Sequence, residues 1–296
     1  MDILVNGEPF ALELPPGATA GEALSLADEI LERAGAVIVG LTVDGKRLDA
    51  EGIPAVGELP AAAVGRIEIE AESAAGVRGK SLSTLLELLA LSRDAAAQES
   101  SPDWPALASG AAELAEAFSG LFSADELSFV QGFADLVGKA ADAPDAALRR
   151  EIGARAEAIA GLARERLAEI EHPAEEMRKA AILYRNQAAE LGELPVLLQT
   201  GKDERAMKAI LLFIETFNKV IRLIPELRRL GLDTEALRVD GQALPEFYAS
   251  FNDILRGLSK AFEDRDAVQI GDLAEYEVAP RMASFFSAVE GALERK

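Results

Sequence analysis

The fold of the N-terminal region is decided by residues 36–49, which read AVIVGLTVDGKRLD. Val37 to Val43 is a nearly continuous run rich in β-branched residues, which is typical of a central strand. The dipeptide Asp44-Gly45 comes directly after it and favours a tight turn, because both residues tolerate positive φ. The stretch therefore predicts a central strand that ends in a turn.

The residues before this strand predict a hairpin. Ile3 to Val5 is a short apolar run, and Asn6-Gly7 is a second pair that favours a hairpin turn. Phe10, Leu12 and Leu14 then alternate with polar or small residues, as a half-buried strand requires. Pro15-Pro16-Gly17 ends this second strand.

One helix should connect the hairpin to the central strand. Thr19 is followed three residues later by Glu22, which is the spacing of a capping box. Apolar residues recur at helical spacing through Leu24, Ile30 and Leu31, and Gly35 is placed to end the helix. Residues 66–72 then alternate again, with Ile67, Ile69 and Ala71 on one face and Glu68, Glu70 and Glu72 on the other.

The predicted order is strand, strand, helix, strand, strand. With this order the segments LELPPGATAGEAL (12–24), AVIVGLTVDGKRLD (36–49) and VGRIEIEAES (64–73) resemble the β-grasp fold of ubiquitin-like and bacterial sulfur-carrier proteins. The resemblance covers about the first quarter of the chain. Those families act through a free C-terminal Gly-Gly, whereas this chain continues past residue 73, so the resemblance implies a domain that binds or docks.

After a small-residue linker at residues 73–80, every strong pattern has the period of a helix. The fold class expected is an α+β, β-grasp-like N-terminal domain followed by an all-α helical bundle. The predicted domains are residues 1–75, a helical region at 80–172 and a helical bundle at 173–296. The predicted helices span 81–99, 104–122, 124–141, 146–170, 174–200, 202–230, 245–264 and 266–294.

Residues 202–230 predict the central helix of the last bundle. Its charged residues fall within an arc of about 80° on a wheel of about 100° per residue, and the other residues, which include most of its apolar side chains, cover more than half of the circumference. We expect this charged strip to be the only wet face of the helix, held by Glu204–Lys208, Glu215–Lys219 and Arg222–Glu226 pairs at i,i+4. An anion-binding strip is the alternative reading. If Lys219 forms one exposed i,i+4 pair, replacing it by alanine should lower the free energy of unfolding by at most about 0.5 kcal/mol.

Composition excludes several functional classes. The chain has 51 acidic and 30 basic residues, a net charge of −21, so a nucleic-acid or membrane-surface partner is not expected. It has no cysteine, which excludes disulfides and thiolate sites. No apolar run approaches the length of a membrane span, and residues 1–10 lack the pattern of a signal peptide, so a cytoplasmic protein without membrane insertion is expected.

No catalytic, cofactor or metal site is predicted. His172 is the only histidine and lies between two predicted helices, where it complements a helix C-terminus. Gly201-Lys202 lacks the remaining residues of a phosphate-binding loop. The acidic group at Asp264, Asp266 and Asp272, with Glu275 and Glu277, lacks calcium-loop spacing, and its first two members are better explained as helix caps.

Trp104 is the one residue with a candidate partner-binding role. It is the only tryptophan and lies in Ser-Pro-Asp-Trp-Pro, where an exposed aromatic ring would anchor a protein partner. The alternative is that it packs at the start of a helix, with Asp103 or Ser101 near the cap.

The function expected from these observations is a non-catalytic adaptor or scaffold, with a protein partner or self-association. Two alternatives stay open. Residues 249–286 resemble uncharacterised bacterial helical domains and, more loosely, flagellin-chaperone bundles, which implies a secretion or flagellar-type chaperone. An enzyme with unrecognised carboxylate chemistry is the other.

Overall fold

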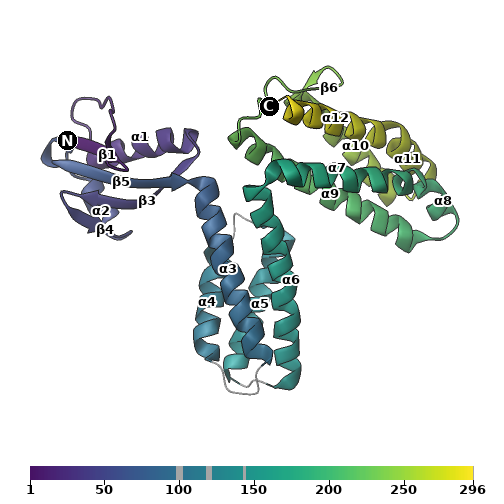
Figure 1. Cartoon of the computed structure of the whole chain (residues 1–296), viewed down its shortest axis with the longest axis horizontal. Coiled ribbons are helices and arrows are strands. Elements are labelled where there is room, and N and C mark those ends of the chain that lie inside the picture. The colour runs from purple at the N-terminus through teal and green to yellow at the C-terminus, as the bar shows by residue number, and fades with distance from the viewer. Residues whose placement is uncertain (98–102, 118–121, 143–144, 296) are drawn as a thin grey trace. The chain divides into compact units, whose positions relative to one another are not determined.

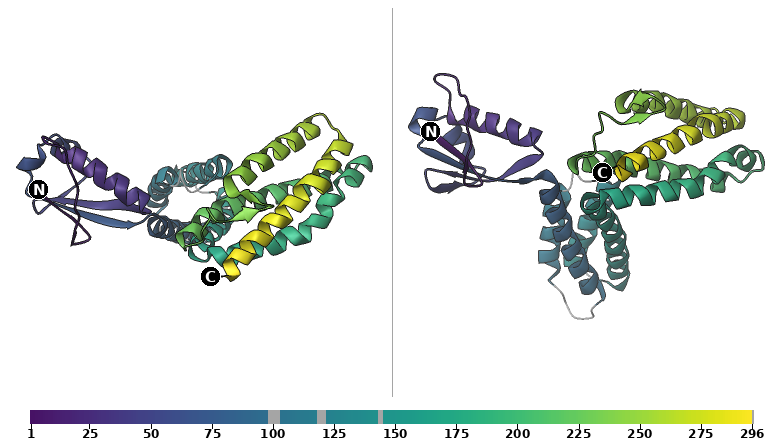
Figure 2. Two further views of the ribbon diagram at one scale, coloured as in Figure 1. Left: turned by 90° about the horizontal axis from the view of Figure 1, so that it is seen from above. Right: turned by 45° about the horizontal axis from the view of Figure 1, so that its top comes forward.

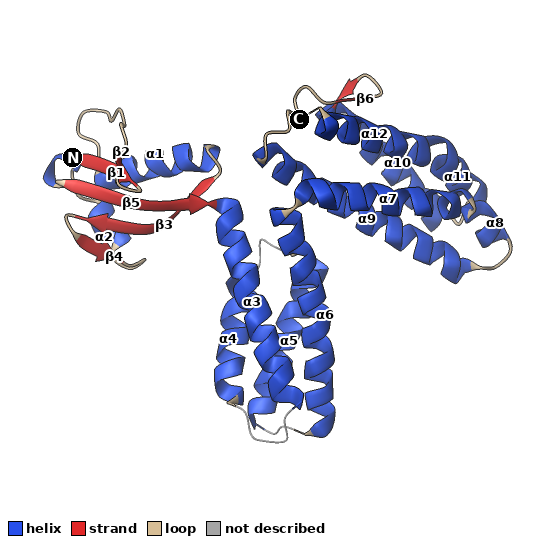
Figure 3. Ribbon diagram, viewed as in Figure 1, coloured by secondary structure: helices blue, strands red, loops and turns tan. Residues whose placement is uncertain are grey.

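The computed structural model describes residues 1–97, 103–117, 122–142 and 145–295 (Figure 1). The chain forms two compact units, Met1–Leu167 and Ala168–Lys296. A mixed sheet opens the first unit and helices make up nearly all the rest, as the sequence predicts at this level (Figure 3). The unit boundary falls within helix α6 (Ala146–Glu171), just before the predicted domain boundary at 172/173.

Five strands form the N-terminal sheet in the order β2-β1-β5-β3-β4. The central strand β5 pairs parallel to β1 and antiparallel to β3, whereas β1–β2 and β3–β4 are antiparallel hairpins. The strands are β1 (Asp2–Val5), β2 (Glu8–Pro9), β3 (Ala36–Val43), β4 (Lys46–Leu48) and β5 (Arg66–Ser73).

Helix α1 (Ala20–Arg33) lies across one face of this sheet (Figure 1). The predicted capping box is present, because Thr19 accepts from the backbone of Glu22 and the Glu22 carboxylate accepts from Thr19 N. Ile67 and Ile69 of β5 are fully buried beneath the helix side of the sheet. The isoleucines of the 66–72 alternation therefore lie on the buried face of the sheet, as predicted. Glu70 lies on the other face and pairs with Arg47.

Two local predictions are wrong in this domain. Residues 10–14 do not form a strand, because β2 ends at Pro9, although Phe10, Leu12 and Leu14 still pack against the core. Residues 73–80 are not a linker, because helix α3 (Ala74–Ala97) begins directly after β5. The Ser73 hydroxyl accepts from Gly76 N at 3.0 Å, so Ser73 acts as a helix cap and favours helix over loop. Two short helical turns, α2 (Ile53–Gly57) and η1 (Ala61–Ala63), complete this domain.

The remainder of the first unit is a group of helices that run side by side (Figures 1 and 3). Ser123 and Glu126 form the predicted cap at the start of α5, and the same Glu126 carboxylate accepts from buried Arg166 at 2.5 Å. One carboxylate therefore fixes the start of one helix and joins it to another. These helices are α3, α4 (Trp104–Ala117), α5 (Ala124–Asp142) and α6.

The second unit is the predicted helical bundle with an added hairpin. Figures 1 and 2 agree that α7, α9, α10 and α12 lie side by side. A two-stranded hairpin turns at Asp240-Gly241, both with positive φ, and was not predicted. The elements are α7 (Pro173–Gly192), α8 (Leu194–Gln199), α9 (Asp203–Arg229), β6 (Arg238–Val239), β7 (Gln242–Ala243), α10 (Leu244–Glu263), α11 (Ala267–Asp272), η2 (Leu273–Val278) and α12 (Ala279–Glu294).

Prolines divide two segments that the sequence predicts as single helices. Segment 174–200 breaks before Pro195, and segment 266–294 contains the π-helical turn η2 just before Pro280. Proline has no amide hydrogen, so the carbonyl four residues earlier loses its donor and the helix ends or widens there. The Tyr184 hydroxyl donates to the Ala279 carbonyl at 2.9 Å, which anchors this junction to α7.

Aromatic rings fill the centre of the bundle. Phe247 stacks on Phe251 and Phe285, with ring centroids 5.6 and 5.7 Å apart. Phe217 of α9 lies 5.1 Å from Phe251, and Tyr184 of α7 lies 5.4 Å from Phe286. The four long helices are thus joined through one continuous aromatic core.

Candidate functional site

The exposed and buried faces of helix α9 differ from those that the sequence predicts. Lys219 and Arg222 lie in the charged strip, yet their side chains are only 15% and 32% exposed. Glu226, in the same strip, is 4% exposed. In contrast, Ile214 and Ile221 are 45% and 46% exposed. The prediction that the charged strip is the only wet face of a central helix is therefore wrong.

The C-terminal part of the charged strip turns inward because Lys219 and Arg222 meet buried carboxylates of other elements, whereas Glu204, Lys208 and Glu215 stay exposed. Lys219 Nζ donates to Glu176 of α7 at 2.7 Å, and Arg222 donates twice to Glu169 of α6 at 2.9 Å. Lys179 also donates to Glu176, at 2.8 Å. These contacts join Lys219 and Arg222 to α7 and α6, so this part of the strip stabilises the packing of the unit, which favours ion pairing over an anion-binding strip.

The ionisation of Glu176 makes the contacts between this carboxylate and the two lysines depend on pH. Burial alone would raise the pKa of Glu176, but hydrogen bonds from Lys179 and Lys219 outweigh burial and lower the pKa below its ordinary value. A carboxyl group with a lowered folded-state pKa stabilises the fold above its unfolded pKa, and this stabilisation is lost as the pH falls through the folded pKa.

We therefore expect Glu176→Gln to flatten the loss of stability between about pH 5 and pH 3. Urea unfolding of the full chain at a series of pH values measures this, with Glu204→Gln on the exposed start of α9 as the matched control. The control should keep the wild-type slope. Equal slopes for wild type and Glu176→Gln would contradict the assignment.

The exposed face of α9 is a narrow apolar stripe. It consists of Met207, Leu211, Ile214, Asn218 and Ile221, which we call the α9 stripe, and all five side chains are exposed. They are spaced four, three, four and three residues apart and fall within an arc of about 80° on a helical wheel. This is the a/d spacing of a coiled-coil seam, with one polar residue, Asn218, inside it.

The two edges of the α9 stripe differ in chemistry. Lys208 and Glu215 lie along the edge beside the charged strip, and both are exposed. Neither forms an ion pair with another residue in the described parts of the chain. Ile210, Phe217 and Ile224 lie along the opposite edge and are 8–9% exposed, where they pass into the aromatic core. The stripe is therefore an unpaired apolar surface with one charged edge and one apolar edge.

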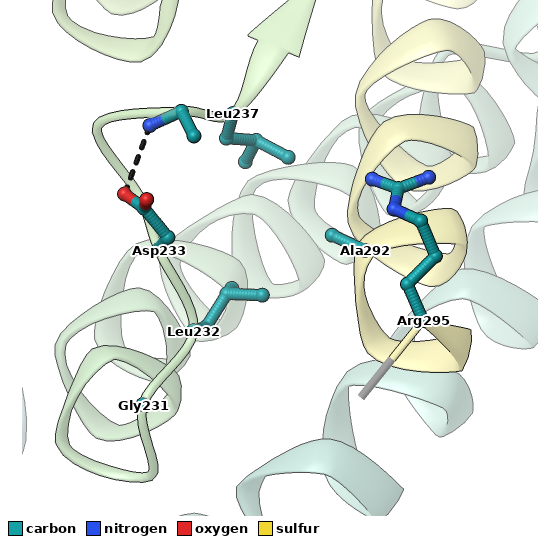
Figure 4. Close-up of a pocket in the computed structure, with 7 residues that line it drawn as sticks. Gly231, Leu232, Asp233, Leu237, Ala292 and Arg295 are labelled. Atoms are coloured by element: carbon teal, nitrogen blue, oxygen red, sulfur yellow. Dashed lines mark hydrogen bonds between the residues drawn. The ribbon is translucent and has the colours of Figure 1, made fainter.

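A small pocket is a second candidate, at the end of the bundle that holds β6. It has a volume of about 260 Å³, and Figure 4 shows Asp233 and Arg295 on opposite sides of its opening. The Asp233 carboxylate already accepts from Glu235 N and Ala236 N at 3.1 and 2.9 Å. Small-molecule sites span about 300–1,000 Å³ with several convergent polar groups, so this pocket is weaker than the stripe as a site.

Trp104 begins α4 and is 2% exposed, so its ring is not presented to solvent. Asp103 caps this helix by accepting from Ala106 N at 3.1 Å, as the alternative reading holds. Ser101, the other proposed cap, lies outside the described residues. Binding of a partner through Trp104 stays a prediction that requires the ring to leave its buried position.

The other singled-out residues lie apart from any candidate site. His172 is exposed between α6 and α7, and Lys202 precedes α9. Asp266 caps α11 by accepting from Val268 N and Gln269 N, as expected, whereas Asp264 lies at the end of α10 and does not cap the start of a helix. Within the described ranges, no group of three or more His, Asp or Glu side chains is placed to hold a metal ion.

No helix in the described part of the chain is both long enough and apolar enough to cross a membrane.

Two family models match parts of the chain. The one described as "TP0873 N-terminal domain" matches residues 1–73, and the one described as "Domain of unknown function (DUF8042)" matches residues 175–287. These segments coincide with the sheet-containing domain and the helical bundle, and the second contains the whole α9 stripe.

An "Uncharacterized protein" of Treponema pallidum (strain Nichols) is 46% identical over 44 residues, 15% of this chain. The matched part covers 22% of that relative's length. No solved structure matches the chain.

Proposed function

We propose that this chain is a non-catalytic protein-binding adaptor or scaffold, and that the α9 stripe is its helix-docking surface. The observation that carries this proposal is the exposure of Met207, Leu211, Ile214 and Ile221 on one face of one helix, at 45–53% each. A regular seam of this kind is the surface that an amphipathic helix covers, because apolar side chains at this spacing pack into a facing helix.

A protein is the partner class that the charge favours. The net charge of −21 repels phosphate backbones and anionic headgroups, and the stripe itself is apolar. An apolar seam gains its binding energy from burial against another apolar surface. Nucleic acid is therefore not the proposed partner.

The N-terminal domain is proposed as the second docking module, with a β-grasp fold. Support comes from the strand order β2-β1-β5-β3-β4, from the parallel β1–β5 pair and from α1 across one face. Because β5 continues into α3 at Ala74, this domain does not end in a free tail of the kind that sulfur carriers and ubiquitin use. Docking fits this connection better than carrier chemistry does.

A photo-crosslinking amino acid at position 211 tests the proposed function. In cells of the native host, we expect it to form a covalent adduct with a protein chain, because Leu211 is 53% exposed within the stripe. The same amino acid at Val268, which is 63% exposed on α11, is the matched control and should form none. No adduct from positions 207, 211 and 214 would overturn the docking surface.

A further inference from the structure

We propose that the occupant of the α9 stripe is the same stripe of a second copy of this chain, paired antiparallel so that Lys208 of each copy faces Glu215 of the other. This inference rests on the proposed function of the stripe as a docking surface, and it names the partner.

The chemistry of the two edges selects the antiparallel direction. In a parallel pair of α9 helices, the charged edge of one copy would face the apolar edge of the other, and Lys208 and Glu215 would lie against Ile210 and Phe217. In an antiparallel pair, each edge faces the same edge of the other copy. Charges then meet charges and apolar side chains meet apolar side chains, which avoids the cost of leaving a charge against an apolar surface.

The order of charges along the charged edge selects the register. Centring the pair on Glu215 would place Glu215 against itself and Lys208 against Arg222, and both contacts are repulsive. Shifting the centre by half a heptad toward the N-terminus places Lys208 against Glu215 in both directions. The two copies then form two equivalent ion pairs, as a two-fold axis requires.

This register pairs four of the five side chains of the stripe and leaves Ile221 outside the paired segment. Leu211 of each copy faces Ile214 of the other at the centre, and Met207 faces Asn218 on either side. The unbranched Met207 side chain has three rotatable bonds and can therefore adapt to the gap beside Asn218. A shift toward the C-terminus would pair Glu215 with Arg222 instead, but Arg222 already donates two hydrogen bonds to Glu169.

The size of the surface sets the strength of the pairing. Stable interfaces bury about 800 Å² on each partner, and five half-exposed side chains with their flanking charges supply less than that. The dimer should therefore be reversible and should dissociate on dilution. It should also weaken with added salt, because its register is held by exposed charges.

Charge reversal on the full chain tests the pairing. Sedimentation velocity over a concentration series should show a monomer–dimer equilibrium for the wild type. Lys208→Glu alone and Glu215→Lys alone should each raise the dimer Kd by about tenfold or more, because each replaces two attractive contacts by two repulsive ones. An equimolar mixture of the two variants should form the mixed dimer at wild-type strength, and uniform ¹⁵N labelling of one variant lets native mass spectrometry distinguish the mixed dimer from both homodimers by mass.

Two controls separate pairing from folding. Lys260→Glu on α10 makes the same charge change away from the stripe and should leave the Kd unchanged. Circular dichroism should show that all three variants keep their helix content and melting temperature. The chain carrying both Lys208→Glu and Glu215→Lys should dimerise like the wild type.

Either of two results would overturn the inference. One is a monomer at every concentration up to about 1 mM. The other is a dimer whose Kd is unchanged by both charge reversals, or a mixture of the two variants that does not regain the wild-type Kd. If the chain is monomeric but position 211 still crosslinks to a different protein, the proposed function stands and only the choice of a second copy fails.

Discussion

Replacing Phe217 by alanine should lower the free energy of unfolding of the second unit by about 3–5 kcal/mol. Phe217 is 8% exposed, and its ring lies 5.1 Å from Phe251 and 6.3 Å from Phe213. The substitution removes an aromatic side chain from the core that joins α9 to α10 and leaves a cavity that rigid neighbouring rings fill poorly. Domains are stable by only about 5–15 kcal/mol, so a large part of the unit's stability should be lost.

Differential scanning calorimetry of the full chain measures this effect, since the transition of the second unit should shift to lower temperature. Ile214→Ala is the matched control on the same helix, because Ile214 is 45% exposed and its loss should cost less than about 1 kcal/mol. If Phe217→Ala left the transition in place and Ile214→Ala lowered it, the assignment of the buried and exposed faces of α9 would be reversed.

The parts of the fold that sequence predicts well are those decided by neighbours in the chain. The capping boxes at Thr19 and Ser123 form as expected, because each needs only one partner three residues away. The strand at 36–43 and the alternation at 66–72 are also found, since β-branched runs favour strands and period-two patterns report a buried face, but β5 lies at the centre of the sheet and β3 lies beside it. The unpredicted hairpin at 238–243 had its signal in Asp240-Gly241.

The candidate site could not be predicted because it depends on distant partners. On a helical wheel, the charged strip of α9 is the obvious wet face and the apolar arc is the obvious core. The wheel does not show the partners of the strip, which come from other helices. Lys219 reaches Glu176, 43 residues earlier in the chain, and Arg222 reaches Glu169, 53 residues earlier. These contacts hold Lys219 and Arg222 inward, and the part of the apolar arc on the other side of the charged strip faces outward as the α9 stripe.

Lys219 gives the sharpest test of this inversion. The sequence alone predicts that Lys219→Ala costs at most about 0.5 kcal/mol, as for an exposed pair on one helix. The structure instead predicts a cost of about 2–3 kcal/mol, because the substitution removes a short hydrogen bond between charged groups that are only 15% and 7% exposed. The cost stays below that of a fully orphaned carboxylate, since Lys179 still donates to Glu176.

Lys208→Ala is the matched control for Lys219→Ala, since Lys208 is an exposed lysine of the same helix and should cost no more than about 0.5 kcal/mol. Urea unfolding of the full chain at neutral pH compares the two variants, and repeating it in acid separates charge from packing. As the pH falls through the lowered pKa of Glu176, the protonated carboxyl no longer attracts Lys219, so the difference between wild type and Lys219→Ala should shrink. If the difference in unfolding free energy between wild type and Lys219→Ala stayed constant with pH, the loss of stability would be due to the packing of the lysine stem against α7. If Lys219→Ala lowered the unfolding free energy no more than Lys208→Ala does, α9 would have the arrangement that the helical wheel predicts.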